Sequence, residues 1–189
     1  MSKEELYFSI DVETDGPIPG PNSMLSFGVV CLSKDGDDLG SFERNLILLD
    51  GAKGDPKTMK WWETQPEAWE ACRKDLVHPQ DAMMDFVEWV DKKVGSVYLP
   101  VAVCMPSGFD FLFMYWYMMH YAGRSPFSFS CVDMRTYVMA MRKTGYKKTS
   151  KRYWPKRWFP KNMPHTHVAV EDAREQGLTF IAMMKENEQ

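Results

Sequence analysis

The chain has 189 residues, of which 44% are hydrophobic, and it carries a formal net charge of −3 at pH 7. This length suits one well-packed domain and is short for two, so we predict a single domain over residues 1–189. No apolar run approaches the roughly 18 residues of a membrane span, and the first residues lack the basic and apolar parts of a secretory signal. We therefore expect a cytoplasmic, intracellular protein with no membrane partner.

The four cysteines are widely separated, and no two of them have CxxC spacing. This pattern argues against a structural zinc site and against the disulfide framework of a small secreted protein. We expect reduced and mostly buried thiols at Cys31, Cys72, Cys104 and Cys131.

An apolar, β-prone run over residues 6–12 predicts a buried first strand, and a loop rich in Gly and Pro follows it. Asp11 and Glu13 come at the end of this run. Side chains two residues apart point to the same face of a strand, so the two carboxylates lie side by side. Because adjacent anions resist ionisation unless a cation lies between them, this strand end predicts a cation site.

The chain that follows predicts a mixed sheet covered by helices. Strands over residues 24–32 and 41–49, joined by the turn SKDGDD, form an antiparallel meander with the first strand. Helical and β patterns then alternate, which is typical of an α/β fold. The expected helices cover residues 57–62, 66–73, 81–94, 109–121, 134–143 and 168–185, and the other expected strands cover residues 97–104 and 129–132.

Residues 142–161 contain nine Lys or Arg and no Asp or Glu, which leaves 14 basic against 26 acidic residues in the rest of the chain. Five aromatic residues lie among these cations. Cations bind phosphates and rings stack on bases, so the segment suits a single-stranded nucleic acid. A solvated loop that keeps the domain soluble explains the composition equally well, and both interpretations stay open.

Two further carboxylates and one imidazole have contexts that suit a metal site. Asp110 follows the strand over residues 97–104 at the start of a helix, Asp172 lies in the first turns of the last helix, and His167 precedes that helix. Mg²⁺ prefers carboxylates, phosphate and water as ligands. Taken singly, each acid is explained more simply by the helix dipole, which favours acids near a helix N-terminus, and His167 by a surface loop.

The ordered combination is more specific than its parts. Asp11-x-Glu13, then Asp110 within GFD, then His167 followed five residues later by Asp172 within HVAVEDA, resemble the DEDDh branch of the DnaQ-like 3′-5′ exonucleases, which includes ribonuclease T and oligoribonuclease. The resemblance spans residues 7–180. It implies a ribonuclease H-like α/β fold, with a five-stranded mixed sheet flanked by helices, and hydrolysis of phosphodiester bonds at a 3′ end.

The resemblance also implies a two-metal mechanism. His167, with an ordinary pKa near roughly 6.5, is the base that takes a proton from the attacking water. His165 and His167 also form an alternate-residue pair that suits a transition metal, but no third nitrogen or sulfur ligand is apparent. Two divalent ions, Mg²⁺ or Mn²⁺, about 3.5–4 Å apart, activate the water and stabilise the leaving 3′ oxygen. Their implied ligands are Asp11, Glu13, Asp110 and Asp172.

Substrate contacts form a second layer of expectations. The segment TMKWWETQPEAWEACR resembles a subgroup that contains phage exonucleases and mycobacterial ribonuclease AS, which places a tryptophan of this segment near the substrate groove. Glycine after the first two acids lets backbone amides approach the terminal nucleotide, and the basic segment supplies cations. The expected substrate-binding residues are Thr14, Asp15, Gly16, Met24, Trp61, Trp62, Lys151 and Arg152.

The surroundings of Asp110 depart from the family pattern. Family members often carry a His-Asn pair four or five residues before this acid, where this chain has Met105 and Pro106. The helix that follows, FLFMYWYMMHY, is apolar nearly all round, which indicates core burial and also suits a subunit interface. Several similar exonucleases are homodimers, so the resemblance includes a homodimer among the expected assemblies.

The sequence therefore predicts a metal-dependent 3′-5′ exonuclease that releases nucleoside 5′-monophosphates from single-stranded DNA or RNA. Two alternatives stay open. The first is a nucleic-acid-binding module on the same fold whose catalysis has been lost, although all five catalytic residues are present. The second is a phosphodiesterase of dinucleotides or other small ligands.

Overall fold

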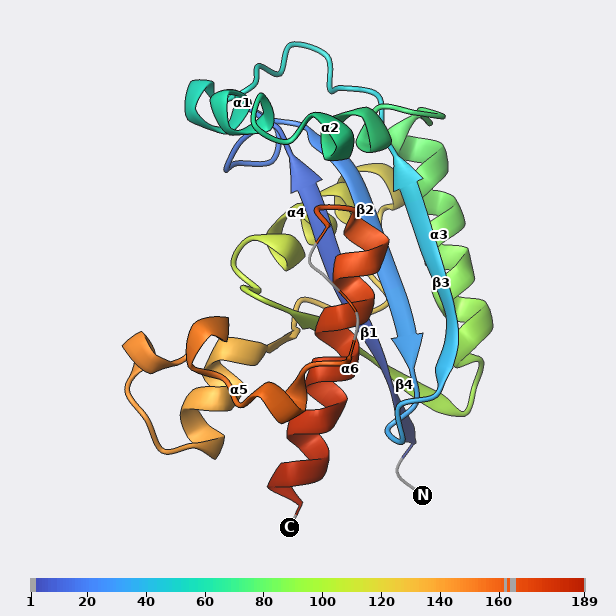
Figure 1. Cartoon of the computed structure of the whole chain (residues 1–189). Coiled ribbons are helices and arrows are strands. Elements are labelled where there is room, and N and C mark those ends of the chain that lie inside the picture. The colour runs from blue at the N-terminus through green and yellow to red at the C-terminus, as the bar shows by residue number, and fades with distance from the viewer. Residues whose placement is uncertain (1–2, 162, 164–165, 189) are drawn as a thin grey trace.

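A computed structural model describes residues 3–161, 163 and 166–188, which form a five-stranded sheet with helices on both faces (Figure 1). The strands are β1 (Glu4–Thr14), β2 (Met24–Leu32), β3 (Asp38–Asn45), β4 (Tyr98–Cys104) and β5 (Val132–Asp133). Their order is β3-β2-β1-β4-β5. The pairs β1-β2 and β2-β3 are antiparallel, whereas β1-β4 and β4-β5 are parallel, so the predicted meander and mixed sheet are confirmed.

The helices divide between the two faces of the sheet. Figure 1 shows α6 crossing in front of the strands, with α3 along the other side. The last turn of α4 continues as a π-helical turn over Met118–Ala122, which is where the predicted helix over residues 109–121 changes its hydrogen bonding. The helices are α1 (Pro56–Trp62), α2 (Pro66–Cys72), α3 (Pro79–Val94), α4 (Asp110–Tyr117), α5 (Met134–Met141) and α6 (Ala169–Asn187).

The side chains of β1 alternate between two cores. Phe8 and Ile10 are fully buried in the cluster that includes α3 and α4, whereas Tyr7 packs edge-on against Phe180 of α6, with ring centroids 5.6 Å apart. Both faces are covered, which explains why residues 6–12 are largely apolar rather than apolar at alternate positions. The same alternation directs Asp11 and the other odd-numbered side chains of β1 to the α6 face.

Two predicted strands differ from the observed ones. The strand predicted over residues 41–49 runs over Asp38–Asn45 instead, because the chain beyond Asn45 turns to Val77, whose carbonyl accepts a hydrogen bond from the Ile47 amide. The strand predicted over residues 129–132 is wrong except for its last residue. The Asp133 side chain accepts a hydrogen bond from the Thr136 amide and caps α5, so β5 stops after two residues.

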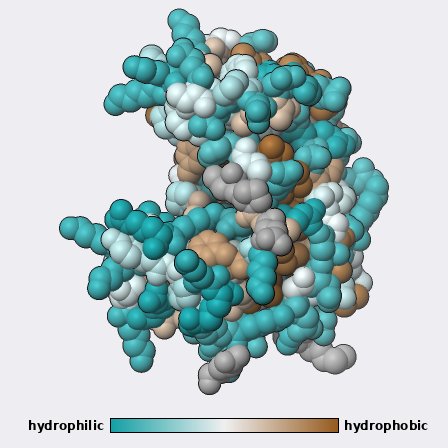
Figure 2. Space-filling model, viewed as in Figure 1, coloured by the Kyte–Doolittle hydropathy of each residue, from teal (hydrophilic) through white to brown (hydrophobic). Residues whose placement is uncertain are grey.

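No helix within the described ranges is long and apolar enough to span a bilayer. The space-filling view shows a largely hydrophilic face that is hollowed between two lobes (Figure 2). One lobe is formed by α1 and α2, and the other by α5 and the basic segment of residues 142–161. The residues predicted for catalysis come from the elements between these lobes and from the loop before α6.

Candidate active site

The end of β1 presents the first two carboxylates of the site. Asp11 pairs in register with Gly28 of β2, and Glu13 pairs with Ser26. Both acids lie in the last part of β1, where the ladder to β2 fixes their backbone positions, whereas the ladder to β4 ends at Ser9. Glu13 is 9% exposed and Asp11 is half-buried. The predicted side-by-side placement of these two carboxylates is thus what the strand geometry produces.

Close packing of α6 on the sheet brings the last acid to the same place. A Cβ atom on Gly28 would collide with the backbone of Val170, so glycine lets the first turn of α6 lie directly on β2. Farther along, Gln176 Nε2 donates hydrogen bonds to Ser9 Oγ at 3.1 Å and to Ile10 O at 3.0 Å. These contacts fix the rotation and height of α6, which carries Asp172 over β1.

Asp110 enters the cluster from the start of α4. The amides of Phe109 and Asp110 donate to Pro106 O at 3.1 and 3.3 Å, which closes the turn between β4 and α4. The Met105–Pro106 peptide bond is cis. Asp110 is 3% exposed, and no described residue forms a hydrogen bond with its buried Oδ2 atom. One carboxylate oxygen of this residue is thus available to a ligand.

Asp172 also shapes the loop that carries the histidine. Its Oδ1 accepts a hydrogen bond from the Thr166 amide at 3.1 Å, and its Oδ2 accepts one from the His167 amide at 3.0 Å. His167 has a φ of 57°, in the left-handed region that side chains other than glycine adopt infrequently. One ligand atom from each of Glu13, His167 and Asp172 lies within 4.8 Å of the others. His165 lies outside the described residues.

The electrostatics of the cluster follow from burial and repulsion. Burial, then the charges of Asp110, Glu13 and Asp172, raises the pKa of Asp11 well above its usual range. Burial is also the main reason why the pKa of Glu13 rises to about 8 and that of Asp110 to about 7. Lys151 opposes the rise for both Asp11 and Asp110. Carboxyl groups in this state ionise fully near neutral pH only when further positive charge compensates them.

The donor atoms fit divalent metal ions. A buried carboxylate oxygen without a hydrogen-bond donor, as at Asp110, costs free energy that a bound cation would offset. Four carboxylates supply the hard oxygen ligands that Mg²⁺ and Mn²⁺ prefer, and one imidazole lies beside them. A bound cation would also favour the ionised form of Asp11 and Glu13, whose pKa values are raised mainly by burial.

Four of the expected substrate-binding residues are held within the protein. Thr14 Oγ1 donates to Gly16 O at 2.9 Å, and the Asp15 amide donates to Ser23 O at 3.0 Å. A Cβ atom on Gly16 would collide with the side chain of Asn22, so this glycine is required for packing of the loop. Met24 is fully buried, and its amide donates to the hydroxyl of Tyr117. These residues shape the floor beside Glu13 rather than project into the open hollow.

The other expected contacts lie on the two lobes. Trp61 is 37% exposed and meets the His167 ring edge-on, with centroids 5.0 Å apart. Trp62 is buried, and its indole Nε1 donates to Thr14 O at 2.9 Å, so it supports the strand end. Lys151 Nζ lies 2.6 Å from Glu175 Oε2 and faces the acidic cluster, whereas Arg152 stacks on a tyrosine of the basic segment.

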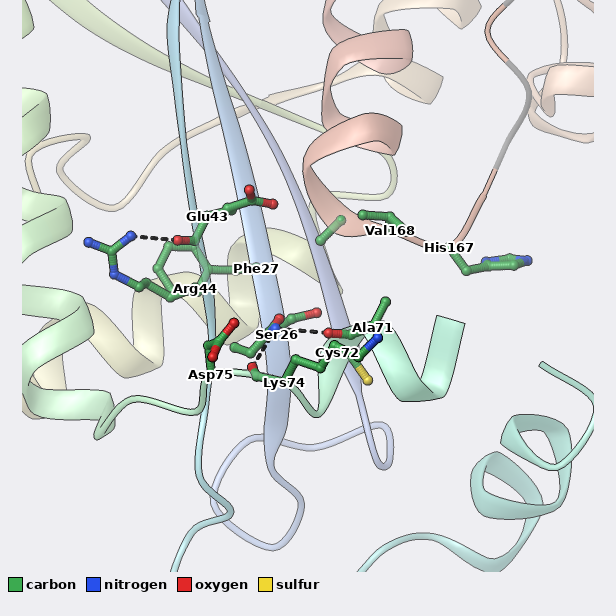
Figure 3. Close-up of a pocket in the computed structure, with 12 residues that line it drawn as sticks. Ser26, Phe27, Glu43, Arg44, Ala71, Cys72, Lys74, Asp75, His167 and Val168 are labelled. Atoms are coloured by element: carbon green, nitrogen blue, oxygen red, sulfur yellow. Dashed lines mark hydrogen bonds between the residues drawn. The ribbon is translucent and has the colours of Figure 1, made fainter. Parts of the chain in front are cut away.

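A cavity of about 430 Å³ lies behind the histidine loop. It is bounded by β2 and β3, the end of α2, and the backbone before α6. Figure 3 shows the His167 ring pointing away from Glu43 and Arg44, which line the far end. Asn45 Nδ2 donates to Ala71 O and Lys74 O and thereby joins α2 to the sheet at this edge. The cavity therefore lies between β3 and the loop that carries His167.

Sequence reasoning did not identify two residues that position the site. Glu175 is 6% exposed and pairs with Lys151, and it lies three residues after Asp172, which places both on one side of α6. That spacing was the available signal. Gly28 was not identified because a glycine inside an apolar strand does not show which element approaches it.

Comparisons with known proteins agree with this geometry. The family described as the 3′-5′ exoribonuclease Rv2179c-like domain matches residues 7–184. A relative from Escherichia coli, the 3′-5′ DNA exonuclease Cap18, is 30% identical over 185 residues, which cover 98% of this chain and 95% of the relative. The relative therefore matches the chain over nearly its whole length.

Solved structures show the same fold. The nuclease domain of 3′hExo, a DEDDh family member bound to rAMP, superposes with a TM-score of 0.75 at 12% identity, covering 98% of this chain and 94% of that one. Exonuclease I from E. coli in complex with a dA16 oligonucleotide gives a TM-score of 0.65 at 13% identity, covering 97% of this chain and 41% of that one. The predicted ribonuclease H-like fold is thus confirmed.

Proposed function

The chain belongs to the family of Rv2179c-like 3′-5′ exoribonuclease domains, and from this premise we propose that residues 1–189 act as a single exonuclease domain that removes nucleoside 5′-monophosphates from single-stranded 3′ ends. One observation carries the proposal. Ligand atoms of Glu13, His167 and Asp172, which are up to 159 positions apart in the chain, lie within 4.8 Å of one another. Asp11 and Asp110 interact electrostatically with the same group.

We assign the metal-binding role to the four acids. Asp11, Glu13, Asp110 and Asp172 would hold two divalent ions, Mg²⁺ or Mn²⁺. When bound, such ions supply a water of lowered pKa as the nucleophile and stabilise charge on the leaving 3′ oxygen. The buried oxygen of Asp110 that lacks a hydrogen-bond partner among the described residues and the raised pKa values of Asp11 and Glu13 support this assignment.

We assign the role of general base to His167. A ring nitrogen of this residue would take the proton of the attacking water, for which an imidazole has a suitable pKa near neutral pH. The loop is held by amide hydrogen bonds to Asp172, and the edge-on contact with Trp61 restricts the ring. Such contacts hold the imidazole in a fixed position, within reach of the reacting atoms.

The substrate is a nucleic acid 3′ end in this proposal. The family is described as exoribonuclease, whereas the curated relative is named a DNA exonuclease, and the solved neighbours contain rAMP in one case and dA16 in another. We therefore propose either polymer as substrate. The floor of the terminal nucleotide site would be formed by Thr14, Asp15, Gly16 and Met24. One side would be formed by Trp61 of α1, which Trp62 supports. The opposite lobe would contribute Lys151 and Arg152.

A direct assay tests the proposal. Purified protein is incubated with 5′-labelled RNA and DNA oligonucleotides carrying a single-stranded 3′ end, with Mg²⁺, Mn²⁺ or EDTA. We expect a ladder of shortened products only when a metal is present. Retardation of the oligonucleotide without shortening would instead identify a binding module that has lost catalysis. Cleavage confined to dinucleotides would identify a small-substrate phosphodiesterase. A homodimer stays a prediction, which sedimentation velocity tests.

A further inference from the structure

A shallow groove of about 640 Å³ lies on the lobe formed by α5 and the basic segment. Figure 2 shows this lobe as mainly hydrophilic, beside the hollow that separates it from α1 and α2. Four cations and two aromatic rings line this groove. Its lining residues are Arg135, Tyr146, Lys147, Ser150, Lys151, Arg152 and Tyr153.

Two tyrosines in the groove are presented to solvent together with a guanidinium group. Arg135 lies over the ring of Tyr146 at 4.2 Å from the centroid, and Arg152 lies over the ring of Tyr153 at 4.7 Å. The tyrosines remain 56% and 44% exposed. Rings that contribute to a hydrophobic core are buried, whereas these two rings are exposed and each contacts a cation. Their exposed surfaces are therefore available to stack on a planar partner.

The other aromatic residues of the basic segment have a different role. Trp154 and Trp158 are 5% and 2% exposed and pack with α6, and the indole of Trp154 donates to Thr149 O at 2.9 Å. Arg157 and the indole of Trp158 both bind the carboxylate of Glu186. The segment is therefore fastened to the domain by its buried rings, and this fixes the positions of the exposed ones.

Lys151 links the groove to the candidate active site. This residue lines the groove, and its Nζ lies 2.6 Å from Glu175 Oε2. Glu175 is one turn along α6 from Asp172, which belongs to the carboxylate cluster. A strand whose 3′ end reaches the cluster would thus pass Lys151 before it reaches the exposed tyrosines.

On the basis of the proposed function, we infer that this groove binds the nucleotides on the 5′ side of the scissile one, with bases stacked on Tyr146 and Tyr153 and phosphates paired with Lys147, Lys151 and Arg152. Only unpaired bases offer free faces to such rings, so the groove selects single strands. The cations fit the phosphates that run between stacked bases. The polymer thereby gains affinity from a surface that does not touch the reacting phosphodiester.

The test compares a long and a short substrate. The long one is an oligonucleotide of about 12 nucleotides, which spans a typical single-strand site, and the short one is the p-nitrophenyl ester of thymidine 5′-monophosphate, which reaches the catalytic centre alone. For the double variant Tyr146→Ala/Tyr153→Ala we expect KM for the oligonucleotide to rise by about tenfold or more, as expected for lost stacking. Turnover of the ester should stay within about twofold of the parent, since the variant leaves the catalytic groups in place.

Matched controls keep the result specific. Phe129→Ala removes a ring that is 79% exposed and outside the groove, and Lys92→Ala removes a cation from α3 on the opposite face of the sheet. Neither should change KM for the oligonucleotide, whereas Lys147→Ala should raise it and lower its salt dependence. An unchanged KM in the tyrosine variant, or an equal loss on both substrates, would overturn the inference.

Binding in EDTA separates this inference from the proposed function. Fluorescence anisotropy of the labelled oligonucleotide reports affinity whether or not the protein cleaves it. One outcome is that the parent protein does not cleave the oligonucleotide, while the tyrosine variant binds it about tenfold more weakly than the parent does. That outcome would support the groove as a binding site and contradict the exonuclease proposal. If the parent cleaves the oligonucleotide and the variant binds it as tightly as the parent does, the inference about the groove is wrong and the exonuclease proposal is supported. Unchanged thermal unfolding of the variant shows that neither outcome comes from misfolding.

Discussion

The carboxylate cluster and the basic groove lie side by side but are constructed in opposite ways. The acids are buried or half-buried, and they are held by β1, α4 and α6, three elements of the main core. The groove is open, and most of its side chains come from short 3₁₀ turns in the basic segment, which two buried tryptophans hold against α6. Chemistry on a phosphodiester requires desolvated charges in fixed positions, whereas strand binding requires exposed ones.

The two regions also differ in their effect on the stability of the fold. Clustered carboxyl groups have raised pKa values and one unpartnered oxygen atom, so they make the fold less stable when they ionise without metal. The groove residues are largely solvated, so they lower the stability of the fold very little. Lys151 joins the two regions, because it pairs with Glu175 and also opposes the charge of Asp11 and Asp110. Changes on either side of this pair show whether the two regions act separately.

The largest effect is expected for Asp11→Asn. Cleavage should fall by orders of magnitude, because a metal ligand is weakened, while the protein still folds. Thermal unfolding in EDTA should occur at an equal or higher temperature, since the substitution removes a buried carboxyl group whose ionised form the fold disfavours. Asp85→Asn, on an exposed side chain of α3, is the matched control and should retain activity. Normal turnover of Asp11→Asn would contradict the assignment of the cluster.

Trp154→Ala tests whether the basic segment depends on its buried rings. Removal of a nearly fully buried indole, together with its hydrogen bond to Thr149 O, should lower the free energy of unfolding by about 3–5 kcal/mol. Tyr153→Ala, the adjacent but 44% exposed residue, should lower it by less than about 1 kcal/mol. Urea titrations of both variants measure this contrast. Equal losses would mean that the two kinds of aromatic residue are not distinct.

Gly28→Ala tests how closely α6 must approach the sheet. The added Cβ atom meets the backbone at Val170, which cannot move without the helix, so unfolding should become easier by about 1–3 kcal/mol. Exonuclease turnover should fall as well, because Asp172 shifts with the helix. Gly145→Ala, where a Cβ atom meets nothing within 4 Å, serves as control. A variant with full stability and activity would show that this contact is not required.

The last prediction concerns the joint effect of pH and metal on stability. The folded-state pKa values of Glu13 and Asp110, about 8 and about 7, lie above their ordinary values of 4.5 and 3.8. The metal-free folded protein therefore binds more protons than the unfolded chain, and stability should decrease as pH rises from about 5 through 8. The melting temperature, measured in EDTA, should therefore decrease over this pH range. Mn²⁺ should raise the melting temperature more at pH 8 than at pH 6, and equal shifts would argue against metal binding by these acids.

The sequence determined most of the chain's secondary structure because local patterns report local structure. The strand over Met24–Leu32 was predicted with its observed bounds, and the helices around the Trp-Trp pair were predicted to within one residue. Predictions failed where a distant partner contacts the end of an element, as at Asn45, whose side chain binds the end of α2, and at Asp133, whose carboxylate accepts a hydrogen bond from the Ser107 amide as well as capping the next helix. Such endings depend on which segments meet in space.

For the site, the sequence by itself predicted which acids and which imidazole form the candidate active site, since residue type and order are properties of the chain. Only the tertiary structure decided how they meet: Gly28 lets α6 lie on β2, and Glu175 holds Lys151 toward the acids. It also divided the aromatic residues of the basic segment into buried anchors and exposed rings. The physical reason is that burial and ionisation depend on what each side chain packs against, and those neighbours come from parts of the chain far away in sequence.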